Sequence, residues 1–235
     1  MGKDRGKLPS APAEAAVAEF LEQVARAPAP RPAEGRGRLV FAMDATASRE
    51  PTWDRACQIQ GEMFRATDAL GGLDVQLVFY RGFGECKVSP WVSSSAALVR
   101  RMTGVFCLAG QTQIGKVLRH VTAETKRCKV NALVFVGDCM EESIDALAQL
   151  AGELGLQGVP AFMFHEGGDP IAGKAFKEIA RLTRGAYCRF DAASAQQLKD
   201  LLSAVAVYAA GGRRALEHYG RTKGGLVLQL THQVR

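Results

Sequence analysis

Strand patterns alternate with helix patterns from Arg38 to Ala209, and this alternation restricts the chain to one broad class of fold. The expected strands cover residues 38–43, 74–80, 85–88, 131–137, 159–164 and 186–190. The expected helices cover residues 51–69, 94–103, 113–127, 142–154, 171–183 and 194–209. Most of these strands are nearly continuous apolar runs, as strands buried on both faces are. Strands that alternate with helices of this length predict parallel βαβ units, and hence an α/β fold.

The composition is that of a soluble globular protein. The 235 residues are 47% hydrophobic and 23% charged, which is enough for one sizeable core. No apolar run approaches the roughly 20 residues of a membrane helix. The charged N-terminus does not resemble a secretory signal, and the six cysteines are scattered without a CxxC pair. We therefore expect reduced thiols, a cytoplasmic location and no membrane contact.

The chain divides into a leader, a core and a C-terminal extension. Residues 1–37 hold a segment with helical spacing and then a Pro-rich linker, and residues 38–209 form the core. Residues 210–235 offer a basic helix followed by an apolar run that fits an added strand. The core is electrically neutral, because residues 39–209 carry 18 basic and 18 acidic side chains. The net charge of +6 therefore sits on the two ends, which argues against a basic face for nucleic acid.

Polar side chains follow two of the buried strand patterns at the point where each ends. Asp44 follows residues 38–43, with Thr46 and Ser48 on the same loop, and Asp138 follows residues 131–137. Thr112 enters from a third loop, ahead of a helix. Functional groups of an open parallel sheet gather at the carboxyl ends of its strands. Carboxylate and hydroxyl oxygens suit a hard cation, so these residues predict a Mg²⁺ or Mn²⁺ site.

These residues resemble the metal-ion-dependent adhesion site of von Willebrand factor A (VWA) domains. Asp44-x-Thr46-x-Ser48, Thr112 and Asp138 fill the five positions of its signature in order, with Thr in place of the first Ser. The resemblance covers about residues 38–209. It implies a Rossmann-like sheet of six strands with one antiparallel edge strand beginning near residues 81–84, and helices on both faces.

The resemblance also implies a function. In such domains the metal's open position accepts a carboxylate from a protein partner, so we expect a non-enzymatic adaptor that binds a partner's Asp or Glu. Intracellular relatives serve larger machines, including AAA+ ATPases and chaperone-like complexes. Arg81 and Phe83 on one side, and His165 and Glu166 on the other, are candidates for the rim that a partner touches, although each also fits an ordinary surface loop.

Three other interpretations remain open from the sequence. Gly110–Lys116 with Asp138 resembles a P-loop NTPase, with residues 105–109 as the preceding strand, but Val117 has no hydroxyl for Mg²⁺. That interpretation also leaves the Asp44 loop unexplained. A haloacid-dehalogenase-type phosphatase needs a second carboxylate where Thr46 stands. Residues 211–235 offer a basic tail for nucleic acid, but a short basic segment is typical of a solvated face. We find no nucleophile with a base beside it, so we expect no enzymatic activity.

Overall fold

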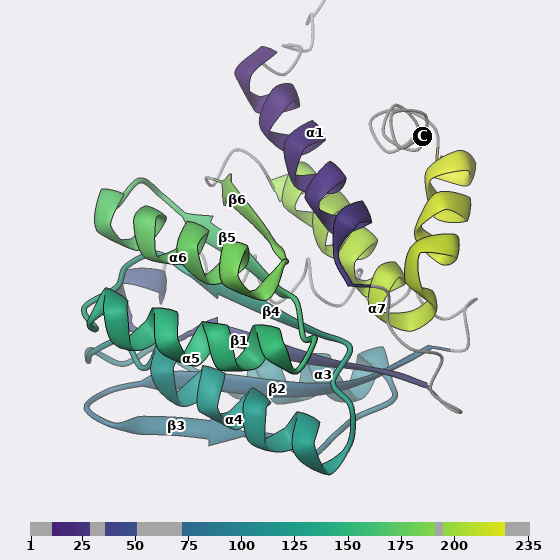
Figure 1. Ribbon diagram of the computed structural model, residues 1–235. Helices are drawn as coiled ribbons and strands as arrows, with labels where there is room; N and C mark the ends of the chain where they lie inside the picture. Colours follow the sequence, from purple (N-terminus) through teal and green to yellow (C-terminus); the bar gives the residue numbers. More distant parts are fainter. Residues whose placement is uncertain (1–10, 29–35, 51–71, 191–194, 224–235) are drawn as a thin grey trace, which may run out of the picture.

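A six-stranded, mostly parallel sheet forms the centre of the protein (Figure 1). The computed structural model describes residues 11–28, 36–50, 72–190 and 195–223. The strands are β1 (Gly37–Asp44), β2 (Leu73–Arg81), β3 (Glu85–Val88), β4 (Ala132–Gly137), β5 (Ala161–Glu166) and β6 (Ala186–Phe190), in the spatial order β3-β2-β1-β4-β5-β6. β3 pairs antiparallel with β2, and the other neighbouring pairs are parallel. The predicted six-stranded sheet with an antiparallel edge strand is confirmed.

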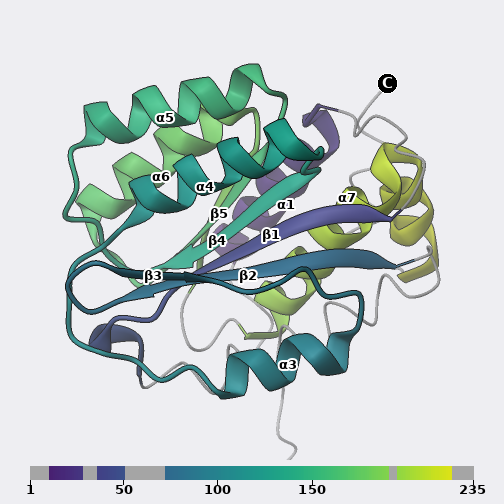
Figure 2. The ribbon, with the colours of Figure 1, turned by 90° about the horizontal axis from the view of Figure 1, so that it is seen from below.

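Helices cover both faces of the sheet, as Figures 1 and 2 show. They are α1 (Ala11–Arg26), α3 (Ser95–Thr103), α4 (Ile114–Arg127), α5 (Ile144–Leu156), α6 (Pro170–Thr183) and α7 (Ala195–Lys223). α4, α5 and α6 pack on one face, and α1, α3 and α7 on the other. The helix expected at residues 51–69 lies outside the described residues. None of the described helices is long and apolar enough to cross a membrane.

The apolar run of β1 divides its side chains between two hydrophobic cores. Successive strand residues point to opposite faces of a sheet. Leu39, Phe41 and Met43 therefore lie in the core under α1 and α7. Val40 and Ala42 lie in the core under α4, α5 and α6. A strand covered on both faces needs apolar residues at every position, which explains why this segment shows no polar alternation.

The leader helix α1 belongs to the same core as the sheet. Val17, Phe20, Leu21 and Val24 follow the three- and four-residue spacing of one helical face, and all four are buried. The ring of Phe20 lies 5.2 Å from that of Phe164 on β5. α1 also contacts α7 and β6. This segment thus covers the same face of the sheet as α7, at its β6 edge.

The last core helix and the basic helix expected after it form one kinked element. The sequence predicts a helix over residues 194–209 and a basic helix within residues 210–235. α7 contains both, joined at Gly212, whose φ of 67° and ψ of −161° are not helical. The chain turns there, and Leu216 beyond the turn is buried on the core. The strand expected near residues 226–231 lies outside the described residues.

Candidate metal centre

Asp44 and Asp138 meet at the carboxyl end of the sheet. β1 and β4 are parallel neighbours, with Met43 level with Val136, so the loops that follow them begin side by side. A carboxylate oxygen of Asp44, one of Asp138 and the sulfur of Cys139 all lie within 4.8 Å of one another. The two acidic residues that the sequence singled out are therefore adjacent in space.

Asp44 is fully buried, and hydrogen bonds from neighbouring residues fix both oxygens of its carboxylate. One carboxylate oxygen accepts a hydrogen bond from the backbone N–H of Thr46 at 2.7 Å. The other accepts from the hydroxyl of Tyr80 at 3.0 Å. Burial raises the pKa of Asp44, the hydrogen bonds from Thr46 and Tyr80 lower it, and the charge of Asp138 raises it further. A nearby dication would favour the charged carboxylate.

Asp138 differs, because one of its oxygens has no hydrogen-bond partner among the residues that the structure describes. Oδ1 is shielded from water and makes no hydrogen bond in the described part of the chain. A buried acceptor without a partner is rare in folded proteins and costs free energy. A cation between Asp138 and Asp44 would satisfy this oxygen and offset the repulsion between the two carboxylates. The donor set therefore fits a metal ion.

The predicted hydroxyl residues lie on loops that contacts tie together at this end of the sheet. Thr46 Oγ1 is 3.1 Å from Ser48 Oγ, at the start of a short 3₁₀ helix (Ala47–Arg49). Thr112 Oγ1 accepts from the N–H of Glu141 at 3.0 Å, and the Thr112 N–H donates to the Glu141 carboxylate at 3.1 Å. This reciprocal pair fixes the Thr112 loop against the loop that carries Asp138.

Two residues beside the carboxylates were not expected from the sequence. Tyr80 lies level with Asp44 in the β1–β2 register and is completely buried. Burial and the charge of Asp44 raise its pKa well above the ordinary value, so it remains a hydroxyl donor. Burial, and then the charges of Asp138 and Asp44, raise the pKa of Cys139 to about 12. A neutral thiol is a weak ligand, so the oxygen atoms define the character of the site.

The hairpin expected at the rim exposes one of its two candidates. Phe83 lies at the β2–β3 turn and is 85% exposed. Arg81 is instead buried, and its guanidinium donates to the backbone oxygen of Phe106 at 2.7 Å and to Glu85 at 3.0 Å. Gly82 and Gly84 have φ of 58° and 107°, which glycine adopts without the penalty of a side chain. Arg81 therefore shapes this rim, while Phe83 is presented to solvent.

The structure places His165 and Glu166 behind the metal loops and away from an exposed rim. His165 is only 1% exposed, and its ring nitrogens lie 2.9 Å from the Tyr187 hydroxyl and 3.3 Å from the Asp138 backbone oxygen. Glu166 forms an ion pair of 2.6 Å with Arg49, which is itself buried. His165 supports the Asp138 loop and Glu166 anchors the Asp44 loop. Burial leaves His165 without a surface that a partner can reach.

The P-loop interpretation does not fit this geometry. Residues 105–109 form a loop, where a P-loop protein has a strand. The ammonium of Lys116 donates to Gly84 O and to Gln113 Oε1, each at 2.8 Å. The carboxylate of Glu142 accepts from the N–H groups of Ile114 and Gly115 at 2.6 and 2.9 Å. A carboxylate thus already sits at the helix N-terminus where a P-loop binds phosphate.

No protein-family profile and no curated protein sequence matches this chain at a significant level. Solved structures do match it. The SpRpn10 VWA domain superposes with a TM-score of 0.59 at 13% identity, covering 71% of this chain and 94% of that one. A von Willebrand factor type A protein from Catenulispora acidiphila gives 0.58 at 17% identity, covering 73% of this chain and 43% of that one.

A third match concerns the metal site itself. Proximal thread matrix protein 1 from the mussel byssus, in a form with a zinc-occupied adhesion-site motif, gives a TM-score of 0.55 at 16% identity. The alignment covers 76% of this chain and 46% of that one. At these identities the comparisons establish the fold alone. This chain has the von Willebrand factor A fold.

Proposed function

We propose that this chain is a metal-dependent protein-interaction module. A Mg²⁺ or Mn²⁺ ion is held by Thr46, Ser48 and Thr112, with Asp44 and Asp138 as direct ligands or through water. The observation that carries the proposal is the buried oxygen of Asp138 that has no hydrogen-bond partner among the described residues and lies within reach of Asp44. Hydroxyl and carboxylate oxygens match the preference of these hard cations. Such an ion supplies a Lewis-acid position that accepts one further oxygen ligand.

The residues around the ion favour a carboxylate as that ligand. Asp44 and Asp138 bring two negative charges, and where one of them acts through water the dication keeps enough positive charge to attract one more anionic group. Phe83 adds an exposed apolar contact at the edge of the same loops. One metal contact covers little area, so affinity should depend strongly on the metal unless a larger interface forms. The partner is therefore a protein that presents an Asp or Glu.

The wider setting is part of the same proposal. Five cysteines among the described residues are free thiols, which fits a reducing compartment, and we place the module in the cytoplasm. AAA+ ATPases and chaperone-like complexes are the partners to test first. We assign no catalytic role, because Asp44 and Asp138 are accounted for by the cation and Lys116 by the hairpin contact.

Calorimetric titration of Mn²⁺ into wild type and Asp138→Ala tests the site. We expect saturable one-site binding that the substitution abolishes. Asp145→Ala is the matched control, because Asp145 is an exposed carboxylate in the first turn of α5. Equal Mn²⁺ affinity in wild type and Asp138→Ala would refute the assignment.

Partner capture with and without the metal tests the function. Proteins retained by the Mg²⁺-loaded module should be released by EDTA and recovered when Mg²⁺ is restored. Asp138→Ala should behave like EDTA treatment, and Asp145→Ala like wild type. Retention that is indifferent to EDTA, by an Asp138→Ala protein that is folded, would refute metal-dependent binding.

A further inference from the structure

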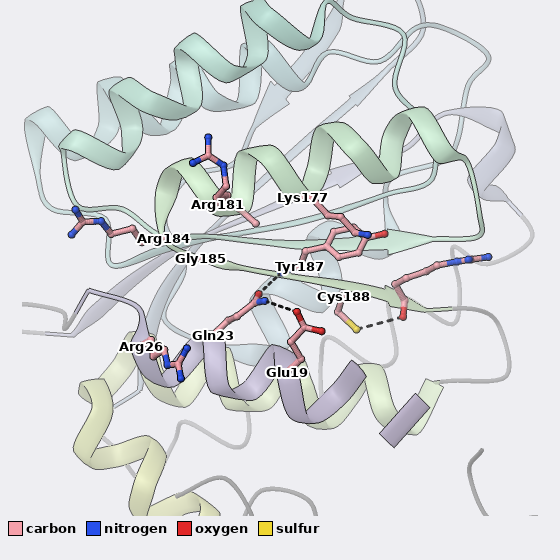
Figure 3. Close-up of a pocket in the computed structure, with 11 residues that line it drawn as sticks. Glu19, Gln23, Arg26, Lys177, Arg181, Arg184, Gly185, Tyr187 and Cys188 are labelled. Atoms are coloured by element: carbon pink, nitrogen blue, oxygen red, sulfur yellow. Dashed lines mark hydrogen bonds between the residues drawn. The ribbon is translucent and has the colours of Figure 1, made fainter. Parts of the chain in front are cut away.

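A pocket of about 720 Å³ opens at the β6 edge of the sheet, on residues that the metal centre does not use (Figure 3). α1, the C-terminal half of α6 and strand β6 form its walls. The side chain of Gln23 bridges two of these walls. Its oxygen accepts from the backbone N–H of Tyr187 at 3.3 Å, and its amide donates to Glu19 at 3.3 Å. The volume lies in the range of small-molecule sites, roughly 300–1,000 Å³.

Cations dominate the lining of this pocket. Five basic side chains and one carboxylate, Glu19, contribute to it; the basic ones are Arg26, Lys177, Arg181, Arg184 and Arg189. Glu22 pairs with Arg26, and Glu178 pairs with Arg181 at 2.6 Å. Among the described residues, the ion pairs include none with Lys177, Arg184 or Arg189. Arg189 donates from its guanidinium to the backbone oxygen of Gly167, on the loop after β5. Lys177 and Arg184 therefore bring positive charge to the pocket that no ion pair among the described residues neutralises.

Helix electrostatics account for only part of this charge. A cation in the last turn of a helix is stabilised by the helix dipole, which explains Arg181 and contributes at Arg184. Lys177 lies further back on α6, with its ammonium 5.2 Å from the centre of the Tyr187 ring. Arg189 comes from a strand, and the loop after β5 holds its guanidinium. Lys177 has no such reason to lie here, and Figure 3 shows it beside Tyr187.

The backbone at Arg184 points to the same conclusion. Arg184 ends α6 with φ 55° and ψ 34°, and no other non-glycine residue in the described ranges has a positive φ. A left-handed conformation is unfavourable for a residue with a side chain, so glycine is usual there. The glycine stands one residue later, where a Cβ at Gly185 would come 1.9 Å from Ala161 O. An exposed arginine therefore stands where the backbone alone would favour glycine.

We propose that this pocket binds a small, multiply charged oxyanion, such as a phosphate ester or a polycarboxylate. Arginine forks and an ammonium match phosphate and carboxylate oxygens, with charge-assisted hydrogen bonds. The size of the pocket suits a small ligand. This site is independent of the proposed metal centre and of its function.

Pyrophosphate and citrate are the probes. Each is titrated into the full-length, metal-free protein at low ionic strength, and amide chemical shifts are followed by NMR. We expect saturable shifts confined to the pocket-lining segments of α1, α6 and β6. Binding by pyrophosphate alone, by citrate alone or by both supports the site and identifies the preferred oxyanion. Failure of both to saturate would overturn it.

Two variants locate the binding. Lys177→Gln and Arg184→Gly should each weaken the affinity about tenfold, because each removes a charge-assisted hydrogen bond. Arg184→Gly should melt no lower than wild type, since glycine relieves the positive φ. Lys126→Gln, at an exposed position on α4, is the matched control and should bind as wild type does. Equal losses in all three variants would show non-specific surface attraction and refute the pocket.

Discussion

The loop after β1 and the loop after β4 hold their aspartates in opposite ways. Asp44 is fully buried, and both of its oxygens accept hydrogen bonds, from Thr46 and Tyr80. Asp138 keeps one shielded oxygen that has no hydrogen-bond partner in the described ranges. The two residues come from adjacent parallel strands, yet the protein satisfies one carboxylate and leaves the other incomplete.

This difference separates two roles of a carboxylate at a metal site: stabilising the fold and binding the ion. Asp44 contributes to the fold whether or not an ion is present, since its hydrogen bonds need no metal. Asp138 gains its missing interaction only from an ion. Substitutions at the two positions should therefore have the same effect on metal binding and different effects on stability. The predictions below test this separation, beginning with the largest expected effect.

Loss of the ion pair behind the Asp44 loop should have the largest effect. Glu166→Ala leaves the buried guanidinium of Arg49 without its carboxylate at 2.6 Å. Breaking a buried pair on one side typically costs about 3–5 kcal/mol of unfolding free energy. Urea denaturation measures this, and Glu178→Ala, from an exposed pair on α6, is the control. A loss no larger than that of the control would mean that the Asp44 loop is not anchored in this way.

Bound metal should stabilise the wild-type protein, and this stabilisation should depend on Asp138. An ion at a hundred times its dissociation constant adds about 2.7 kcal/mol to the unfolding free energy. We expect this gain with Mn²⁺ in wild type and no gain in Asp138→Ala, measured by thermal melting in matched buffers. Stabilisation of both proteins to the same extent would place the ion elsewhere.

Asp44→Ala and Asp138→Ala should separate in metal-free buffer. The first leaves the Thr46 N–H and the Tyr80 hydroxyl without their acceptor, and should cost about 1–3 kcal/mol. The second removes a partnerless oxygen and a like-charge neighbour, so it should cost little or stabilise the protein slightly. Chemical denaturation after removal of divalent ions gives both values. If Asp138→Ala proved the more destabilising of the two, the contrast between the loops would be wrong.

The smallest expected effect is a loss of folding stability at acidic pH. Burial lowers the pKa of His165, which lies between Tyr187 and the Asp138 backbone, and the charge of Arg189 acts in the same direction. Asp138 and Asp169 act the opposite way. The folded protein therefore takes up this proton less readily than the unfolded chain, and stability falls as the pH drops below about 6.5 toward the lowered pKa. Burial lowers the pKa of His120 too.

Denaturation at several pH values tests this. His165→Gln should flatten the decline between about pH 7 and pH 5, and His120→Gln should flatten the remainder. A decline that is unchanged in His165→Gln would show that this histidine does not couple folding to protons.

Much of the fold could be predicted because its signals are local. The alternation of apolar runs with helical spacing gave the sheet and its covering helices, and the turn at Gly82–Gly84 gave the antiparallel edge. The basic helix after residue 209 was predicted as well, but its connection to the preceding helix was not. Leu216 is buried beyond Gly212, so the two helices join through a kink and form α7.

The candidate site was predictable only in part. Asp44 and Asp138 could be paired because the carboxyl ends of parallel strands meet at one edge. Tyr80 required the register between β1 and β2, which no single segment reveals. The burial of His165 and the Arg49–Glu166 pair depend on contacts between loops far apart in the chain. Residue type suggested a polar rim at His165 and Glu166. Only the packing shows that His165 is buried and that Glu166 pairs with Arg49.

The carboxylate of Glu142 at the start of α4 blocks phosphate binding at this helix. The segment Gly110–Lys116 lacks only a following hydroxyl residue to match a nucleotide-binding motif, so Val117→Thr would complete the pattern. That variant should still fail to bind ATP, because Glu142 already holds the N–H groups of Ile114 and Gly115 and would repel a phosphate. Removing Glu142 first would leave those two donors unpaired. A variant that lacks Glu142 and still has Val117 should therefore be less stable than this protein and should not yet bind a nucleotide.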